Sequence, residues 1–175
     1  MNLSYLLDPA HWDPAAAEGA MPAMSEGDFY VTDGQEITLG DRTLTAVFTP
    51  GHTPGTISLL FPVTWNGEAH VASYAGGQGS PDAVPELVQF RTSLDHLGVY
   101  NDLMQADVVL SNHTVGDDGL SKIARMAADP SVNPYVVGRE AVIGYHEMWR
   151  ACLSADIEQR VHDGTAADPA ATLAR

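Results

Sequence analysis

A single histidine stands in a stretch whose backbone has little freedom. His52 lies between Pro50-Gly51 and Pro54-Gly55, and alternating apolar segments flank the stretch on each side. Proline fixes one backbone dihedral and glycine permits positive ones, so the two steps together determine where the imidazole points. A metal ligand needs this preorganisation, because a mobile imidazole must be ordered when the ion binds. The pattern predicts a stiff turn between two strands, carrying either a structural histidine or a metal ligand.

The residues on both sides of this turn have the pattern of an antiparallel sheet. Short apolar runs alternate with turn dipeptides such as Asp33-Gly34 and Asn66-Gly67. They predict strands at residues 29–32, 36–39, 43–48, 57–63 and 69–74. Consecutive strands joined by tight turns form a meander, one face of which is buried.

The second half of the chain alternates helical and strand patterns. Apolar residues at helical spacing predict helices at residues 81–104, 117–128 and 138–157. Between the first two, residues 107–113 predict a short strand with an apolar centre and a polar end, Ser111-Asn112-His113. Strand ends are where α/β proteins keep their chemistry, so His113 is a second candidate site residue. The fold class is therefore α/β.

A glycine-rich loop, Ala-Gly-Gly-Gln-Gly-Ser at residues 75–80, follows the last strand of the meander. It has neither the dinucleotide nor the Walker spacing, so it is not a phosphate-binding loop. Glycine at these positions indicates a close backbone approach or a positive dihedral. The sequence leaves open whether this serves a site or only a bend.

Charge and composition exclude several partners. At 175 residues the chain is one domain in size, and 45% hydrophobic with 18% charged residues is typical of a globular protein. The formal charge of -15, from 23 acidic and 8 basic residues, opposes binding to nucleic acid or to an anionic membrane surface. No apolar run is long enough to span a membrane, and the single cysteine does not reveal the compartment.

We expect three segments along the chain. Residues 1–28 form an N-terminal strand and loop segment, and residues 29–160 form the principal α/β unit. Residues 161–175, rich in Ala, Asp, Gly, Pro and Thr, form a flexible tail.

Two motifs resemble one known family. Thr-Pro-Gly-His-Thr-Pro-Gly-Thr-Ile-Ser, which contains His52, resembles the third zinc-histidine loop of the metallo-β-lactamase superfamily. Val-Leu-Ser-Asn-His, which ends at His113, and the segments at residues 118–123 and 133–142 are similar to the C-terminal part of the subclass whose zinc ligands include no cysteine. The resemblance extends over residues 29–153.

The resemblance implies a fold, a cofactor and a reaction. The fold is half of an αββα sandwich, with an antiparallel or mixed sheet and helices on one face. The cofactor is Zn²⁺ in two sites, with His52 on the first ion and His113 on the second. The reaction is hydrolysis of an amide or ester bond in a β-lactam- or lactone-like small-molecule substrate by a metal-bound hydroxide. Glyoxalase-type members place a bridging aspartate where this chain has residues 74–77, so the missing carboxylate favours the lactamase-like branch.

One departure limits this hypothesis. The family's signature His-x-His-x-Asp-His supplies the other zinc ligands, and it occurs nowhere in the 175 residues. Catalytic zinc takes three protein ligands, whereas each site here retains one histidine. We therefore expect a hydrolase that is incomplete as this chain alone and needs an N-terminal half-domain or self-association.

The same partner is expected from packing. In the complete sandwich a second sheet covers apolar side chains of this one, which we expect to be left open here. They are Phe48, Ile57, Leu59 and Phe61. The alternative is a non-catalytic, truncated or degenerate module of the same fold that serves binding or oligomerisation.

Overall fold

The computed structural model describes residues 29–164. The chain divides into two units, residues 1–31 and residues 32–175, and the described part of the first unit has no regular structure. The expected segment 1–28 and residues 165–175 of the expected tail lie outside the described residues. The strand predicted at residues 29–32 is not formed. The further description concerns the second unit.

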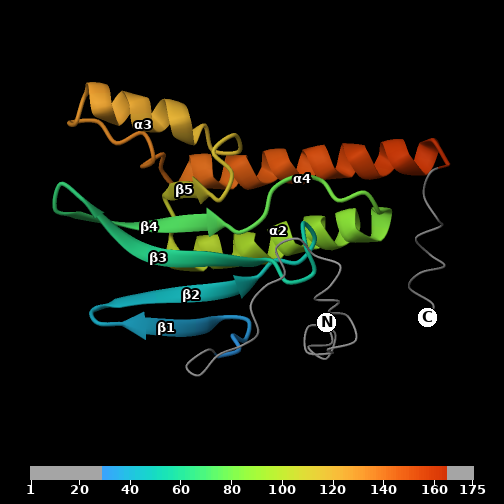
Figure 1. Ribbon diagram of the computed structural model, residues 1–175, viewed down its shortest axis with the longest axis horizontal. Helices are drawn as coiled ribbons and strands as arrows, with labels where there is room; N and C mark the ends of the chain where they lie inside the picture. The colour runs from blue at the N-terminus through green and yellow to red at the C-terminus, as the bar shows by residue number, and fades with distance from the viewer. Residues whose placement is uncertain (1–28, 165–175) are drawn as a thin grey trace, which may run out of the picture. The chain divides into compact units, whose positions relative to one another are not determined.

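Five strands form one mixed sheet (Figure 1). They are β1 (Gln35–Leu39), β2 (Arg42–Phe48), β3 (Ile57–Trp65), β4 (Glu68–Ala75) and β5 (Val108–Ser111). The strands lie in sequence order, antiparallel from β1 to β4, and β5 is parallel to β4. The predicted meander from β1 to β4 is confirmed, and so is the α/β class.

Tight turns that contain glycine join β1 to β2 and β3 to β4. Gly40, with a φ of 63°, lies between β1 and β2, and Asn66 and Gly67, with φ of 48° and 84°, join β3 to β4. Two successive positive dihedrals match the twist of the flanking strands in a two-residue hairpin. A parallel neighbour requires a longer crossover, and the helix α2 (Val84–Met104) provides it between β4 and β5.

Two further helices, α3 (Gly119–Ala128) and α4 (Arg139–His162), follow β5. α2 and α4 lie side by side (Figure 1). No helix within residues 29–164 is both long enough and apolar enough to cross a membrane.

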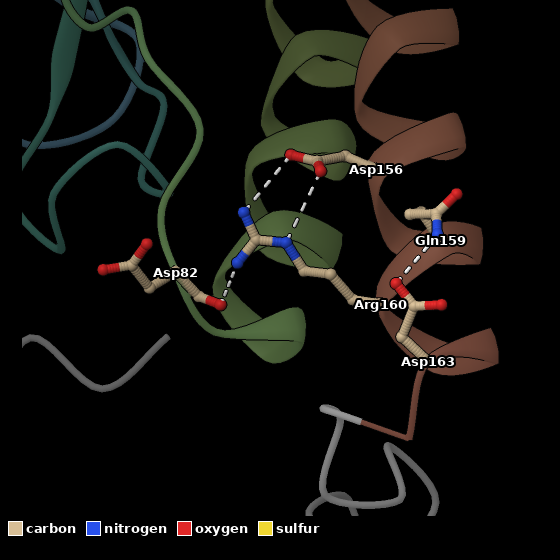
Figure 2. Close-up of polar contacts among 5 residues, drawn as sticks. All are labelled: Asp82, Asp156, Gln159, Arg160 and Asp163. Carbon is tan, nitrogen blue, oxygen red and sulfur yellow. Dashed lines mark hydrogen bonds and ion pairs between the residues drawn. The ribbon is translucent and has the colours of Figure 1, made fainter.

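The C-terminal end of α4 is held to the start of α2. Arg160 donates hydrogen bonds to the carboxylate of Asp156 and to the backbone carbonyl of Asp82 (Figure 2). Gln159 donates to the carboxylate of Asp163 at 2.8 Å. Pairs four residues apart support a helix, and α4 therefore ends at His162 rather than at the predicted residue 157. It extends two residues into the range 161–175 that we expected to be a tail.

α2 and α4 cover one face of the sheet. Val47 of β2, Leu60 of β3 and Val109 of β5 lie on this face and pack with Leu97 of α2 and Val142 of α4 in one buried cluster. A second cluster joins the two helices directly. Its buried members are Leu87, Phe90, Leu94 and Leu153. The expected arrangement, with helices on one face, is present.

The opposite face carries the apolar side chains that we expected to be open. Phe48 pairs with Ile57, and Leu59 and Phe61 follow on the same side of β3. Ile57 is 36% exposed, and the other three are half-buried. This strip is therefore less open than expected.

Candidate metal site

The turn that carries His52 joins β2 to β3 and is fixed against α2. Backbone hydrogen bonds close the turn. The hydroxyl of Ser93 in α2 donates to the carbonyl of Pro50 at 2.6 Å. A Cβ at Gly51 would lie 2.2 Å from the Cβ of Phe90 in α2, so only glycine permits this approach. The predicted stiffness of the turn has this tertiary contact as a second cause.

One hydrogen bond orients the His52 ring. Its Nδ1 lies 3.1 Å from the carbonyl oxygen of Gly79. A carbonyl oxygen only accepts, so Nδ1 carries the proton and Nε2 keeps its lone pair. Metal-binding histidines commonly donate their second ring N–H in this way, which fixes the tautomer and raises the basicity of the other nitrogen. The half-buried His52 is thus arranged to bind a ligand through Nε2.

His113 lies in the turn that follows β5, and its side chain is exposed. Its backbone N–H donates to the hydroxyl of Ser111 at 3.0 Å, and its carbonyl accepts the N–H of Gly116 at 2.9 Å. Neither ring nitrogen has a hydrogen-bond partner within residues 29–164. The backbone is therefore held while the imidazole is available.

The structure brings the two imidazoles together. Their ring centroids are 5.9 Å apart, and the ring planes meet at 83°. The residues meet because β2, β4 and β5 all end at the same edge of the sheet. Two histidines on one tetrahedral zinc ion have ring centres about 5 Å apart, so this spacing suits a shared ion or two neighbouring ions.

The glycine-rich loop after β4 contacts both histidine-bearing segments. A Cβ at Gly77 would lie 2.7 Å from the Cβ of His52, which is closer than Cβ atoms approach other atoms. Asn112, next to His113, donates its amide to the carbonyl of Gly76 at 2.8 Å. These glycines therefore allow close backbone approach at the end of the sheet where the two histidines lie.

Three further polar side chains beside these segments were not identified from the sequence. The amide of Gln78 donates to the hydroxyl of Tyr145, and the carboxylate of Asp117 accepts the N–H of Ser111 at 3.2 Å. Burial raises the pKa of Tyr145, and the negative charge of Asp117 raises it further. The only signal in the sequence for any of these three side chains was the glutamine that lies among glycines.

The donor set fits zinc in kind but not in number. Imidazole nitrogens suit zinc, and the orienting bond of His52 is one that zinc ligands make. Within residues 29–164, however, no group of three or more His, Cys, Asp or Glu side chains could hold a metal ion. Metal binding by His52 and His113 therefore stays a prediction.

Solved structures similar to this chain are metallo-β-lactamases. BJP-1, a subclass B3 enzyme of Bradyrhizobium japonicum, is 27% identical with a TM-score of 0.63, and the match covers 87% of this chain and 57% of BJP-1. A metallo-β-lactamase from Cronobacter sakazakii is 25% identical over 80% of this chain and 52% of that protein, with a TM-score of 0.57. MEM-A1, a subclass B3 enzyme from a soil metagenome library, is 23% identical over 83% and 58%, with a TM-score of 0.61. The chain has the metallo-β-lactamase superfamily fold over the length that it spans.

The chain spans about half the length of these proteins. No protein-family model matches the sequence, and no curated protein matches it. The structural similarity therefore establishes the fold, and the activity is a matter for proposal.

Proposed function

We propose that the chain carries part of a zinc-dependent hydrolase site, built on His52 and His113, that cleaves amide or ester bonds in β-lactam- or lactone-like small molecules. The observation that carries the proposal is the 5.9 Å ring pair at one sheet edge. The similarity of the fold to metallo-β-lactamases such as BJP-1 supports the reaction class.

The two histidines have different parts in this proposal. His52, oriented by its bond to Gly79, presents Nε2, whereas the exposed His113 ring can approach with either nitrogen. Zinc bound there would activate a water molecule and polarise the scissile carbonyl. The acidic net charge of -15 disfavours polyanionic substrates and so favours small neutral or weakly charged ones.

The remaining ligands come, in this proposal, from a further polypeptide segment, either an N-terminal half-domain or a second copy of the chain. Two imidazoles are too few for a catalytic zinc site, which takes three protein ligands. The apolar strip of Phe48, Ile57, Leu59 and Phe61 offers a surface for that segment, because Ile57 is 36% exposed and the other three are only half-buried.

Zinc titration by calorimetry tests the proposal. The chain alone should bind zinc weakly, and His52→Ala or His113→Ala should each lower the affinity about tenfold or more. His162→Ala, at an exposed position near the end of α4, is the matched control and should change nothing. With an N-terminal half-domain added, zinc binding should become tight and a chromogenic cephalosporin should be hydrolysed. Tight stoichiometric binding by the lone chain would contradict the need for further ligands.

A second candidate is a non-catalytic module that binds a partner or another copy. It is favoured by the lack of a third metal-ligand side chain within residues 29–164. In that case neither zinc content nor hydrolysis would respond to His52→Ala or His113→Ala. Ile57→Asp would nevertheless weaken association, measured by light scattering, so the two readouts separate the candidates.

A further inference from the structure

Gln78 is a buried glutamine in the glycine-rich loop at residues 75–80. Its side chain is only 7% exposed, whereas the neighbouring Gly79 and Ser80 are exposed. Its Oε1 atom is buried and has no hydrogen-bond donor within residues 29–164. Burying a long polar side chain with an unpaired oxygen costs free energy, both in lost rotamer freedom and in lost hydration. This cost indicates that the Gln78 side chain has a role other than stabilising the fold.

The contacts of Gln78 reach the turn that carries His113. A Cβ at Gly116 would overlap the amide of Gln78, with Oε1 only 1.4 Å away, so the side chain lies directly on the Gly116 backbone. The N–H of Gly116 in turn donates to the carbonyl of His113 at 2.9 Å. The other end of the amide donates to the Tyr145 hydroxyl on α4, which holds the side chain in place.

The backbone of the same loop reaches the other histidine. The carbonyl of Gly79, the residue after Gln78, accepts the Nδ1 proton of His52. A Cβ at Gly79 would lie 3.7 Å from the ring, and one at Gly77 would lie 2.7 Å from the His52 Cβ. One short segment therefore lies against His52 with its backbone and against the His113 turn with its side chain.

We propose that Gln78 is a positioning residue that sets the distance between the His52 and His113 imidazoles, with Tyr145 as its anchor. Gln78 fills the space beside Gly116 and prevents the His113 turn from closing onto the glycine loop. Tyr145, whose pKa is raised by burial, stays a neutral hydroxyl that can accept the amide proton. The effect of Gln78 on metal binding rests on the proposed function. Its effect on the distance between the two imidazoles does not.

The test compares Gln78→Ala with Gln159→Ala. Each wild-type glutamine donates one hydrogen bond from its amide to a side-chain oxygen, and Gln159 does so at the exposed end of α4 (Figure 2). In the metal-free protein, nuclear Overhauser contacts between the two imidazoles should be lost in Gln78→Ala and kept in Gln159→Ala. Zinc affinity should fall about tenfold in the first variant only.

Tyr145→Phe removes a single oxygen and keeps the ring, so it tests the anchor if Gln78→Ala does not fold. It should weaken the inter-ring contacts and should leave thermal unfolding of the helices close to that of the wild type. Unchanged inter-ring contacts in both Gln78→Ala and Tyr145→Phe would overturn the proposal. A wild-type chain that binds no zinc would overturn the proposed function instead, while the inter-ring contacts would still decide the role of Gln78.

Discussion

Histidines lie at both ends of the sheet, and they differ in their hydrogen-bond partners and in their exposure. Where the strands finish, the ring centroids of His52 and His113 are 5.9 Å apart, and Nδ1 of His52 donates to a backbone carbonyl. Where the strands begin, Nδ1 of His70 lies 2.7 Å from a carboxylate oxygen of Asp107, and the His70 side chain is only 11% exposed. We call the first end open because the His113 side chain is exposed, and the second closed because His70 is paired with Asp107 and little exposed.

Asp107 explains why the second end is closed. Its other carboxylate oxygen accepts the N–H of Val71 at 3.0 Å, and its backbone carbonyl accepts the N–H groups of Val137 and Gly138 at 3.0 and 2.9 Å. The His70–Asp107 pair therefore ties β4, the start of β5 and the start of α4 together. A histidine paired with a partly buried carboxylate stabilises the fold, whereas one oriented by a carbonyl with its other nitrogen open can bind a metal.

The largest effect is expected at His146, which is 5% exposed and whose Nδ1, unlike that of His70, has no partner within residues 29–164. Burial lowers its pKa from 6.5 to about 4. Between these values the unfolded chain binds a proton that the folded chain does not. This contribution to the free energy of unfolding is therefore complete above pH 6.5 and is lost as the pH falls toward 4, by about 3 kcal/mol.

Urea unfolding of the wild type and of His146→Leu between pH 7.5 and pH 4.5 measures this difference. The variant should lose the part of the pH dependence that the histidine causes. Equal pH dependence in both proteins would show that the burial of His146 does not cause the loss of stability at low pH.

The next effect contrasts the two ends of the sheet directly. Asp107→Ala should lower the free energy of unfolding by about 2–3 kcal/mol, because it removes hydrogen bonds to a charged group and leaves His70 unpaired. His113→Ala, at an exposed position, should change it by no more than about 0.5 kcal/mol. Denaturant unfolding of the two variants decides the matter, and a loss at His113 as large as that at Asp107 would break the distinction between an open and a closed end.

The smallest effect concerns the close approach of glycine to His52. Gly77→Ala places a Cβ 2.7 Å from the His52 Cβ, so the imidazole must move, and zinc affinity should fall about tenfold. Gly144→Ala, where an added Cβ meets nothing within 4 Å, is the matched control on α4. It should leave zinc affinity unchanged and stabilise the helix by up to about 1 kcal/mol. If both variants bind zinc equally well in calorimetry, Gly77 does not hold His52.

Local patterns predicted most of the elements. The alternation in β2 to β4, the Asn66-Gly67 turn and the helical spacing in α2 and α4 are signals between near neighbours, which a sequence displays directly. The prediction of a strand at residues 29–32 was wrong, because a local turn forms there instead. In this turn the Thr32 N–H donates to the Gln35 side chain at 2.8 Å. The end of α4 was missed because Arg160 binds Asp82, which is 78 residues away in the sequence.

The sequence by itself therefore determined the two candidate histidines, since each stands in a local context of a stiff turn or a strand end that marks it. Only the tertiary structure decided that their rings meet, that His70 is closed off by Asp107, and that Gln78 lies between the His113 turn and Tyr145. These relations join residues 37 to 67 positions apart. Contacts of that range arise from strand order and helix packing, and they leave no pattern among neighbouring residues.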